Sequence, residues 1–517
     1  MSNERNATDE AVFGIAPTMK KERTMGFWAM AAVTSIWSLA PWCFTQGGTV
    51  VSVLGLKAAL ANIIGVVVIF SIIYLLAVII PARHGIDTFI YQRAVFGHKG
   101  MVVLWFIFML STWGWEAILT QIYGTSLESL YGIATGQTLS EAWIPWLGAT
   151  CVIIGAAIAL MGPKAITRVS YVVIPGVIIV AIVILWVVFS NYSWDELMAL
   201  QATGGGGGEF YQNFMLATEW NLAFVCAWYG SMGVYPRLGK SERVSYWGYM
   251  VGFGFVYALI TCVGAFGSLA ISDMTGVVSS DPSVWFSEIG GPIAILCLIL
   301  LVLSNISIMA TAMYSLSVST KVVRPQWRYN YVVIGWSIYV LILGFVGIVW
   351  DYYNVFLSVV GFIGGPAIII MLVDYFSVRR QKFSLLGILR TDRPGPYSYT
   401  GGFNLLGVVA FICGAIAYFA IYDPLAGVGR VELFYLITGT GFSCIVAGLV
   451  YYIGSKIPAI KRYLLKDRKD AQNDGEIIKS EEELQMLDRA RAAQEAAKSD
   501  SEAATVEPSV ASAGDGA

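Results

Sequence analysis

Two acidic residues interrupt long apolar stretches of this 517-residue chain, and their side chains are the ones best able to do chemistry there. Glu116 lies in the segment STWGWEAILTQ, and Glu219 lies in LATEWNL. Neither has a basic partner on its own segment. An isolated carboxylate in an apolar environment is costly, so a bound proton or cation commonly neutralises it. Both residues are therefore candidate proton carriers, the alternative being a carboxylate close to an aqueous interface.

Tryptophans accompany both carboxylates. Trp113 and Trp115 precede the first one, and Trp220 and Trp228 follow the second. Two indole rings that face each other can bind a flat ring by stacking. We favour Trp115 and Trp228 as such a pair, because a belt of tryptophans at a membrane surface explains Trp113 and Trp220 equally well.

A third polar feature lies in the apolar segment LVLSNISIMATAMYS. It contains Ser304, Asn305, Ser307 and Thr311. Their oxygen atoms are suitable ligands for a small hard cation, especially together with backbone carbonyls from an interrupted helix. The alternative is hydrogen bonding between neighbouring membrane helices.

The composition identifies the kind of protein that must position these side chains. Hydrophobic residues make up 57% of the chain and charged residues only 13%, whereas a soluble domain has about 25% charged residues. This excludes an ordinary soluble enzyme, a nucleic-acid binder and a disordered protein. The chain has two histidines and seven cysteines, none spaced as a metal site, so we expect no metal other than a possible Na⁺. An all-α polytopic membrane protein is the predicted fold class.

Apolar runs of about 20 residues are long enough to cross a bilayer. The sequence predicts twelve such helices, at about residues 27–53, 57–81, 101–124, 143–162, 169–192, 212–236, 246–271, 290–318, 330–350, 353–376, 403–421 and 434–455.

Charge in the loops predicts the orientation of these helices. Basic residues such as Arg237 and Lys240 occur in every second loop, and acidic residues such as Asp273 and Asp351 occur in the intervening ones. Because basic loops stay on the cytoplasmic side, we expect both termini in the cytoplasm and the chain in the plasma (inner) membrane.

Two of the predicted spans contain helix-breaking residues. Pro41 lies in the first span, followed by glycines at 47 and 48 that we expect to loosen the chain. Gly230, Ser231 and Gly233 cluster in the sixth span. Broken helices in corresponding spans are typical of transporters built from two inverted repeats. The spacing therefore predicts repeats of five helices each, followed by two additional helices.

These features predict seven segments. They are a cytoplasmic N-terminal segment (1–25), a first repeat (26–192), an external loop (193–211), a second repeat (212–376), a cytoplasmic loop (377–402), helices 11 and 12 (403–455) and a largely disordered cytoplasmic tail (456–517) with a short amphipathic helix near 478–498.

Two motifs resemble the nucleobase:cation symporter-1 family. The segment GIDTFIYQRAVFGHKG is similar to one family signature, and GGPAIIIMLVDYFSVRRQKF with the later YSYTGGFN is similar to a second, longer one. The matching residues are Gly85, Arg93, Phe96, Gly97, Gly100, Gly365, Pro366, Asp374, Tyr375, Phe376, Arg379, Arg380, Tyr399, Gly402 and Asn404. The resemblance covers about residues 20–460. It implies the LeuT-like 5+5 inverted-repeat fold and transport of ring compounds with Na⁺ or H⁺.

The resemblance also implies a substrate site. Trp115 matches the family tryptophan on helix 3, and Trp228 matches a second stacking tryptophan on helix 6. Leu119 replaces the family's Gln on helix 3, and Met309 replaces the second Asn of an N-x-x-x-N pattern on helix 8. The other residues assigned to this site are Glu116, Gln121, Gly230, Ser231 and Ala40.

A cation site is implied in the same way. Ser304 and Asn305 match family positions on helix 8, while Leu303 replaces a neighbouring hydroxyl residue. Leu300 is assigned to this site too, and helix 1 would add backbone carbonyls, best matched by Ile36 and Leu39.

The departures from the family pattern affect specificity and coupling. Loss of the Gln and Asn side chains removes the groups that read the polar edge of a ring. Glu116, Gln121, Gln46 or Ser231 would take over, or the substrate is cationic and pairs with Glu116. Loss of one hydroxyl in the cation site favours H⁺ over Na⁺.

We therefore predict a secondary transporter for a small flat nitrogen heterocycle, such as a nucleobase, hydantoin, allantoin or vitamin-like ring, working by alternating access. We expect a monomer in the lipid bilayer that has no cofactor and binds no nucleic acid. A facilitative channel or a substrate sensor on the same scaffold is the alternative. A membrane enzyme and an ATP-driven pump are disfavoured, because the sequence contains no HExxH or GxSxG motif and no P-loop.

Overall fold

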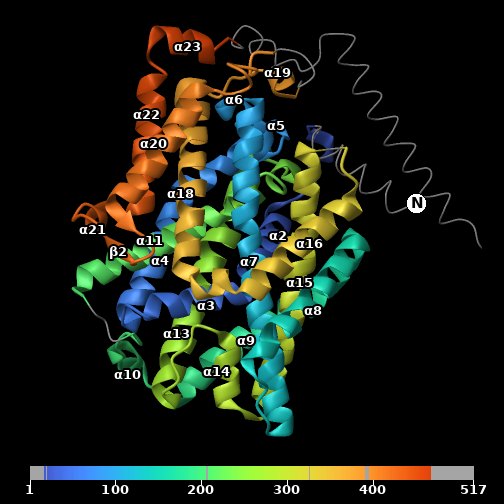
Figure 1. Cartoon of the computed structure of the whole chain (residues 1–517), viewed down its shortest axis with the longest axis vertical. Helices are drawn as coiled ribbons and strands as arrows, with labels where there is room; N and C mark the ends of the chain where they lie inside the picture. The colour runs from blue at the N-terminus through green and yellow to red at the C-terminus, as the bar shows by residue number, and fades with distance from the viewer. Residues whose placement is uncertain (1–16, 19, 205–207, 325, 390–394, 467–517) are drawn as a thin grey trace, which may run out of the picture.

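Long apolar helices form a bundle in the computed structural model (Figure 1), which describes residues 17–18, 20–204, 208–324, 326–389 and 395–466. The first half of the chain contains α2 (Phe27–Ser38), α3 (Pro41–Val51), α4 (Leu56–Tyr74), α5 (Ile79–His84), α6 (Thr88–Phe96), α7 (His98–Thr135), α8 (Ile144–Leu160), α9 (Pro163–Asn191) and α10 (Trp194–Ala199).

The second half repeats this pattern and extends it. It contains α11 (Phe210–Cys226), α12 (Glu242–Tyr249), α13 (Tyr257–Thr275), α14 (Pro282–Ile289), α15 (Gly291–Val323), α16 (Tyr329–Val346), α17 (Ile348–Asp351), α18 (Tyr353–Leu372), α19 (Leu385–Leu389), α20 (Leu405–Ile421), α21 (Phe434–Ile437), α22 (Gly439–Gly454) and α23 (Pro458–Leu464). A hairpin of β1 (Tyr422–Asp423) and β2 (Val428–Gly429) joins α20 to α21.

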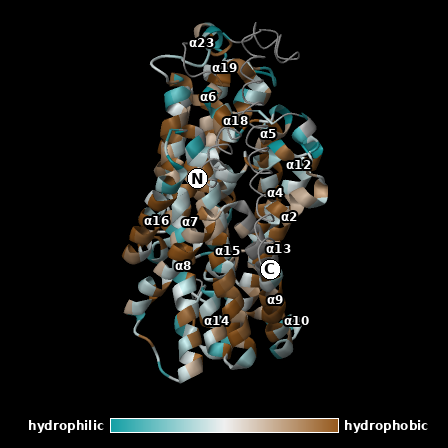
Figure 2. Cartoon of the chain, turned by 90° about the vertical axis from the view of Figure 1, so that its right-hand side faces the viewer, coloured by the Kyte–Doolittle hydropathy of each residue, from teal (hydrophilic) through white to brown (hydrophobic). Residues whose placement is uncertain are grey.

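Apolar residues make up much of the length of the bundle, and polar residues gather at its upper end near α12 and α23 (Figure 2). Seven of the described helical segments are long and apolar enough to cross a membrane, or up to nine if each of two bent pairs is one span. Two further apolar helices, Pro175–Asn191 and Leu405–Ile421, are shorter. The predicted count of twelve is therefore not reproduced by length and hydropathy alone. One reason is that α11 has only 17 residues before its span breaks.

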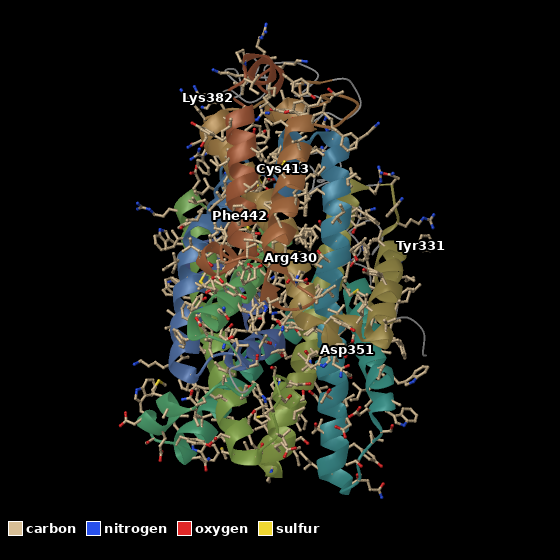
Figure 3. All side chains as sticks on the ribbon, turned by 60° about the vertical axis from the view of Figure 1, so that its left-hand side comes forward. Tyr331, Asp351, Lys382, Cys413, Arg430 and Phe442 are labelled. Atoms are coloured by element: carbon tan, nitrogen blue, oxygen red, sulfur yellow. The ribbon has the colours of Figure 1, made fainter. Side chains whose placement is uncertain are left out.

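A short helix that the sequence did not predict lies at each end of the bundle: α6 at one end and α14 at the other. The α6 end also carries α5, α19 and α23, and the α14 end also carries α10 (Figure 1). Lys382 lies at the α6 end, whereas Asp351 lies toward the other end (Figure 3). Residues 20–25 pack on the α6 end, where the Met25 amide donates to the Leu238 carbonyl at 3.0 Å.

Helices α6 and α14 are related in the way that inverted repeats require. Each follows the second helix of its repeat, and each begins with a buried aspartate that caps it. Asp87 accepts a hydrogen bond from the Phe89 amide at 2.9 Å, and Asp281 accepts one from the Ser283 amide at 2.8 Å. The two helices lie at opposite ends of the bundle (Figure 1).

The predicted break in the first span is present at Leu39 and Ala40. Helices α2 and α3 meet there at an angle of 60°. Pro41 is the first residue of α3, where its missing N–H costs nothing. The expectation that the following glycines loosen the chain is wrong, because α3 continues through them. A Cβ on Gly47 would lie 2.1 Å from the Thr261 carbonyl oxygen, so this glycine allows α13 to approach closely.

The predicted break in the sixth span is also present. Helix α11 ends at Cys226, and a 3₁₀ turn over Ala227–Ser231 and a short 3₁₀ segment at Pro236–Leu238 replace it. Gly233 allows close packing as well, since a Cβ there would lie 2.4 Å from an Asp87 carboxylate oxygen.

The longer signature motif forms a buried clasp near the α6 end. The Asp374 carboxylate accepts hydrogen bonds from Tyr91 at 2.8 Å, Tyr451 at 2.7 Å and Arg379 at 2.8 Å. Both charged side chains of the Arg379–Asp374 pair are fully buried. The clasp joins α6, α22 and the end of the tenth span, which gives these motif residues a structural role. The predicted amphipathic helix near 478–498 lies outside the described residues.

Candidate functional site

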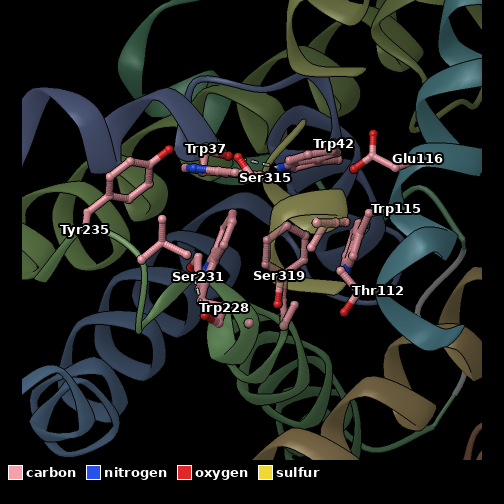
Figure 4. Close-up of a pocket in the computed structure, with 15 residues that line it drawn as sticks. Trp37, Trp42, Thr112, Trp115, Glu116, Trp228, Ser231, Tyr235, Ser315 and Ser319 are labelled. Atoms are coloured by element: carbon pink, nitrogen blue, oxygen red, sulfur yellow. Dashed lines mark hydrogen bonds between the residues drawn. The ribbon is translucent and has the colours of Figure 1, made fainter. Parts of the chain in front are cut away.

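The two broken spans enclose a pocket of about 680 Å³, including space open to solvent (Figure 4). Such a volume suits a small organic ligand. It is lined by Trp37, Trp42, Thr112, Trp115, Glu116, Phe224, Ala227, Trp228, Gly230, Ser231, Val234, Tyr235, Ser315, Leu316 and Ser319. These residues come from the α2–α3 break, the middle of α7, the α11 break and the last third of α15.

Trp115 and Trp228, predicted to stack on a ring, both line this pocket. Phe224 contacts both indoles edge-on, with centroid distances of 4.7 Å to Trp115 and 6.0 Å to Trp228. Phe253 stacks on Trp228 at 4.4 Å. The aromatic groups therefore form a cage of steeply inclined rings around the pocket. Phe224 contacts both of the indole rings, Trp115 and Trp228, that were predicted to stack on a ligand.

Trp37 and Trp42 complete this cage from the two sides of the α2–α3 break. Trp42 is 2% exposed and lies edge-on to Trp115 at 5.8 Å. Its indole N–H donates to the Trp37 carbonyl at 3.3 Å. The sequence analysis did not select these two residues, although a tryptophan on each side of the predicted break was a usable signal.

Glu116 is the acidic side chain of the pocket. It is 1% exposed, and its Oε2 atom has no hydrogen-bond partner. In Figure 4 the carboxylate points toward the Trp42 ring. The pocket is also lined by residues with hydroxyl groups, namely Thr112, Ser231, Ser315 and Ser319. Of these, the sequence indicated only Ser231.

The pocket is more accessible from the α6 end than from the α14 end. Trp37, Ser231 and Tyr235 on the α6 side are all partly exposed. On the other side, a buried hydrogen-bonded chain closes the path. Tyr353 donates to Gln46 at 2.9 Å, and Gln46 donates to Asn221 at 3.1 Å.

The same chain of hydrogen bonds continues to Asn62 on α4. Asn221 donates to Asn62 at 2.9 Å, and Asn62 donates to Thr218 at 2.8 Å. Side chains from α3, α4, α11 and α18 are thereby joined, so an opening at the α14 end requires some of these bonds to break.

Several residues assigned to the substrate site lie elsewhere. Leu119 and Met309 are fully buried, Gln121 is partly exposed, and Ala40 caps α3, but none of the four lines the pocket. Gly230 does line it, together with Glu116 and Ser231. The positions where the family has amides are thus filled by apolar groups outside the pocket.

Two residues assigned to the cation site have buried polar atoms that lack hydrogen-bond partners. Ser304 and Asn305 are fully buried, and the Ser304 hydroxyl and both polar atoms of the Asn305 amide have no hydrogen-bond partner. Oxygen atoms of this kind are suitable Na⁺ ligands, so the donor set fits a small cation.

The other members of that predicted site are placed on neighbouring elements. Leu39 lies at the α2–α3 break itself, and Ile36 lies one turn earlier. Leu300 packs beside Gly176 of α9, where a Cβ on the glycine would lie 3.0 Å from Leu300 Cδ2. No group of three His, Cys, Asp or Glu side chains among the described residues is arranged to hold a metal ion.

Glu219 lies outside the pocket and has a full set of partners. It is fully buried and accepts hydrogen bonds from the Tyr418 hydroxyl at 2.9 Å, the Thr440 amide at 2.8 Å and the Thr440 hydroxyl at 2.7 Å. The carboxylate therefore lies at the N-terminus of α22, where the helix dipole favours a negative charge. This geometry favours a structural role.

Two permeases are similar to this chain in sequence. The Arabidopsis thaliana purine-uracil permease NCS1 is 23% identical over 424 residues, covering 75% of this chain and 69% of the relative. The Microbacterium maritypicum hydantoin permease is 22% identical over 437 residues, covering 80% and 86%.

Solved transporters share the fold. The inward-facing conformation of Mhp1 matches with a TM-score of 0.68 at 19% identity, covering 87% of this chain and 96% of the other. A Na⁺-coupled sialic acid symporter matches with a TM-score of 0.53 at 14% identity, with the same two coverages. The fold is therefore the LeuT-like one. The profile of the family described as permease for cytosine/purines, uracil, thiamine, allantoin matches residues 17–439. This chain belongs to that family, the nucleobase:cation symporter-1 family.

Proposed function

We propose that this permease is a secondary active transporter that takes up a small flat nitrogen heterocycle by alternating access. The observation that carries the proposal is the pocket between the two broken spans, with Trp115 and Trp228 among its lining residues. Indole and phenyl rings supply a large apolar contact area for a planar ligand. The named relatives carry purines, uracil or hydantoin according to their names, which supports a heterocycle of similar size.

The access paths of the pocket support an alternating mechanism. The pocket is accessible from the α6 end, while the chain through Gln46 closes the α14 end. The basic loops support a cytoplasmic location for the α6 end, and with that orientation the arrangement is a state open to the cytoplasm. The proposal includes both termini in the cytoplasm of a cell with the chain in the plasma membrane, and a monomeric transporter.

We propose coupling to Na⁺ or H⁺. The unpartnered oxygens of Ser304 and Asn305 support a Na⁺ site on α15. The unpartnered carboxylate of Glu116 supports H⁺. In either case the cation stabilises the arrangement that binds substrate, and by linkage the substrate strengthens cation binding equally.

Uptake into proteoliposomes tests this function. Radiolabelled uracil, hydantoin, allantoin and thiamine would be supplied under an imposed Na⁺ gradient, an imposed H⁺ gradient or neither. Accumulation of at least one compound above its external concentration is expected under one of the gradients. Trp115→Ala should abolish it, whereas Trp28→Ala is the matched control, because Trp28 lies on α2 with 80% of its surface exposed.

The alternative readings give different results in the same experiment. A facilitative channel equilibrates a substrate without accumulating it, and its flux does not saturate. A sensor binds a compound without flux. If no gradient drives accumulation of any compound that binds, the symport proposal is refuted.

A further inference from the structure

The strongest unexplained feature of the pocket is its electrostatic balance. Glu116 is 1% exposed, lines the pocket and leaves Oε2 without a partner. None of the fifteen residues that line this pocket is a lysine, an arginine or a histidine. Burying a carboxylate without a cationic partner costs free energy. A positively charged ligand in this pocket would supply the missing partner.

The aromatic side chains are arranged as a cage. Neighbouring rings are inclined at 61° for Trp42 and Trp115, 61° for Trp115 and Phe224, and 63° for Phe224 and Trp228. Trp37 and Tyr235 add two further rings. Cages of Trp and Tyr attract cations through the negative faces of their π systems, and they are the usual recognition device for quaternary nitrogen.

The groups that would read a neutral polar ring are few. Leu119 and Met309 bring apolar side chains to their positions and lie outside the pocket. The polar groups that remain besides Glu116 are hydroxyls, such as those of Thr112 and Ser231, and indole N–H groups, of which that of Trp228 has no partner. Selectivity based on a pattern of amide hydrogen bonds is therefore weak here, and selectivity based on charge is strong.

We propose that this pocket selects a positively charged flat nitrogen heterocycle, with Glu116 as its counter-ion and the rings of Trp37, Trp42, Trp115 and Trp228 as its cage. This inference rests on the proposed function and names its substrate class, namely aromatic rings with a quaternary or protonated nitrogen. Glu116 determines specificity by charge, and the cage adds affinity for the same charge.

A pair of ligands that differ only in charge tests the inference. 1-Methylnicotinamide carries a quaternary ring nitrogen, and 3-methylbenzamide has a carbon atom in its place with the same shape. Binding of both to the purified full-length protein would be measured by isothermal titration calorimetry. Uracil and hydantoin serve as neutral rings of the kind named in the relatives. The cation should bind at least about tenfold more tightly than its neutral isostere.

Three variants of α7 locate the effect. Glu116→Gln keeps the size of the side chain and should reduce the charge preference to less than about threefold, since only the cage contribution remains. Glu116→Asp keeps the charge and should retain most of the preference. Glu128→Gln is the matched control, because Glu128 lies on the same helix outside the pocket and should leave the preference unchanged.

The possible outcomes separate this inference from the proposed function. Equal or tighter binding of 3-methylbenzamide in the wild type overturns the inference without any variant, so a misfolded Glu116→Gln protein does not remove the test. The same holds if Glu116→Gln keeps the full preference. If uracil or hydantoin is bound and accumulated in that case, the proposed transport function stands. If neither charged nor neutral rings bind or accumulate, both proposals fail.

Discussion

Replacing Glu219 with glutamine should destabilise this protein, whereas the same change at Glu116 should not. Both carboxylates are almost completely buried. Glu219 accepts three hydrogen bonds that connect α11 to α20 and α22, whereas Oε2 of Glu116 accepts none. The comparison isolates the contribution of partners from that of burial.

The magnitude follows from the contacts of Glu219. In Glu219→Gln, one carboxylate oxygen becomes an NH₂ group. The amide oxygen still accepts bonds from Tyr418 and the Thr440 hydroxyl, but the NH₂ group then faces the Thr440 amide, which is also a donor. Losing that bond and leaving a buried N–H unpaired costs about 2 kcal/mol. Loss of the negative charge at the N-terminus of α22 adds about 0.5–1 kcal/mol. The expected loss is about 3 kcal/mol, whereas Glu116→Gln removes an unpaired buried carboxylate and should not destabilise the protein.

Unfolding in mixed micelles with increasing sodium dodecyl sulfate, followed by tryptophan fluorescence, measures both free energies of unfolding. Thr440→Val removes the hydroxyl donor to Glu219 but keeps the backbone N–H, so in the double variant Glu219→Gln/Thr440→Val the two single losses should add. The reasoning is refuted if Glu219→Gln loses less than about 1 kcal/mol, or if Glu116→Gln is the more destabilised of the two. A double-variant loss well below the sum would show that Glu219→Gln loses the hydroxyl bond of Thr440 rather than the backbone bond.

Three further predictions concern other parts of the molecule. Tyr353→Phe removes the hydrogen bond to Gln46, which is worth ~1 kcal/mol. The ratio of molecules open to molecules closed at the α14 end should therefore rise about fivefold. Double electron–electron resonance between spin labels on α10 and α17 measures that ratio. Asp374→Asn removes the fully buried ion pair with Arg379 and should cost about 3–5 kcal/mol in the same detergent titration, and a loss below 1 kcal/mol would contradict the clasp. Burial raises the pKa of Asp281 from 3.8 to about 6, so its stabilising protonation is complete below pH 3.8 and lost as pH rises through 6. The wild type should therefore lose about 3 kcal/mol of stability relative to Asp281→Asn as pH rises from 3.8 to 6, and parallel pH profiles would disprove it.

Much of the fold was predictable because it depends on local sequence. Pro41 marks the first break, since a proline is tolerated at the start of α3 but not within a continuous helix. The cluster from Gly230 to Gly233 marks the second break. Their spacing predicted two inverted repeats, and the structural relatives share that architecture. The short helices α6 and α14 were missed because eight or nine residues in a loop produce no spanning signal.

The candidate site was harder to predict because it depends on which helices meet. Glu116 and Glu219 have similar apolar surroundings in the sequence, and only the packing gives Glu219 the donors of Tyr418 and Thr440. Phe224 looked like any other apolar residue until its contacts with both indoles were seen. Leu119 was assigned to the site by its position in a motif, and it is buried without lining the pocket.

The glycines near the two breaks indicate how the halves of the molecule are coupled. Gly233 of the sixth span packs against Asp87 at the start of α6, and Gly48 of the first span packs against Ser280, next to the Asp281 cap of α14, where an added Cβ would lie 2.8 Å from Ser280 Cα. Each broken helix is thus held tightly by the short helix of the opposite repeat.

This exchange of contacts links the pocket to both ends of the bundle. A ligand that shifts either broken helix must also shift the short helix packed against its glycine, because neither contact leaves room for a methyl group. The two ends differ in charge: Arg237 and Arg93 act on Asp87 at the α6 end, whereas hydrogen bonds from Ser283 and Thr125 act on Asp281 at the other. Closing the α6 end therefore rearranges a carboxylate faced by arginines, and closing the α14 end rearranges a carboxylate held by neutral donors.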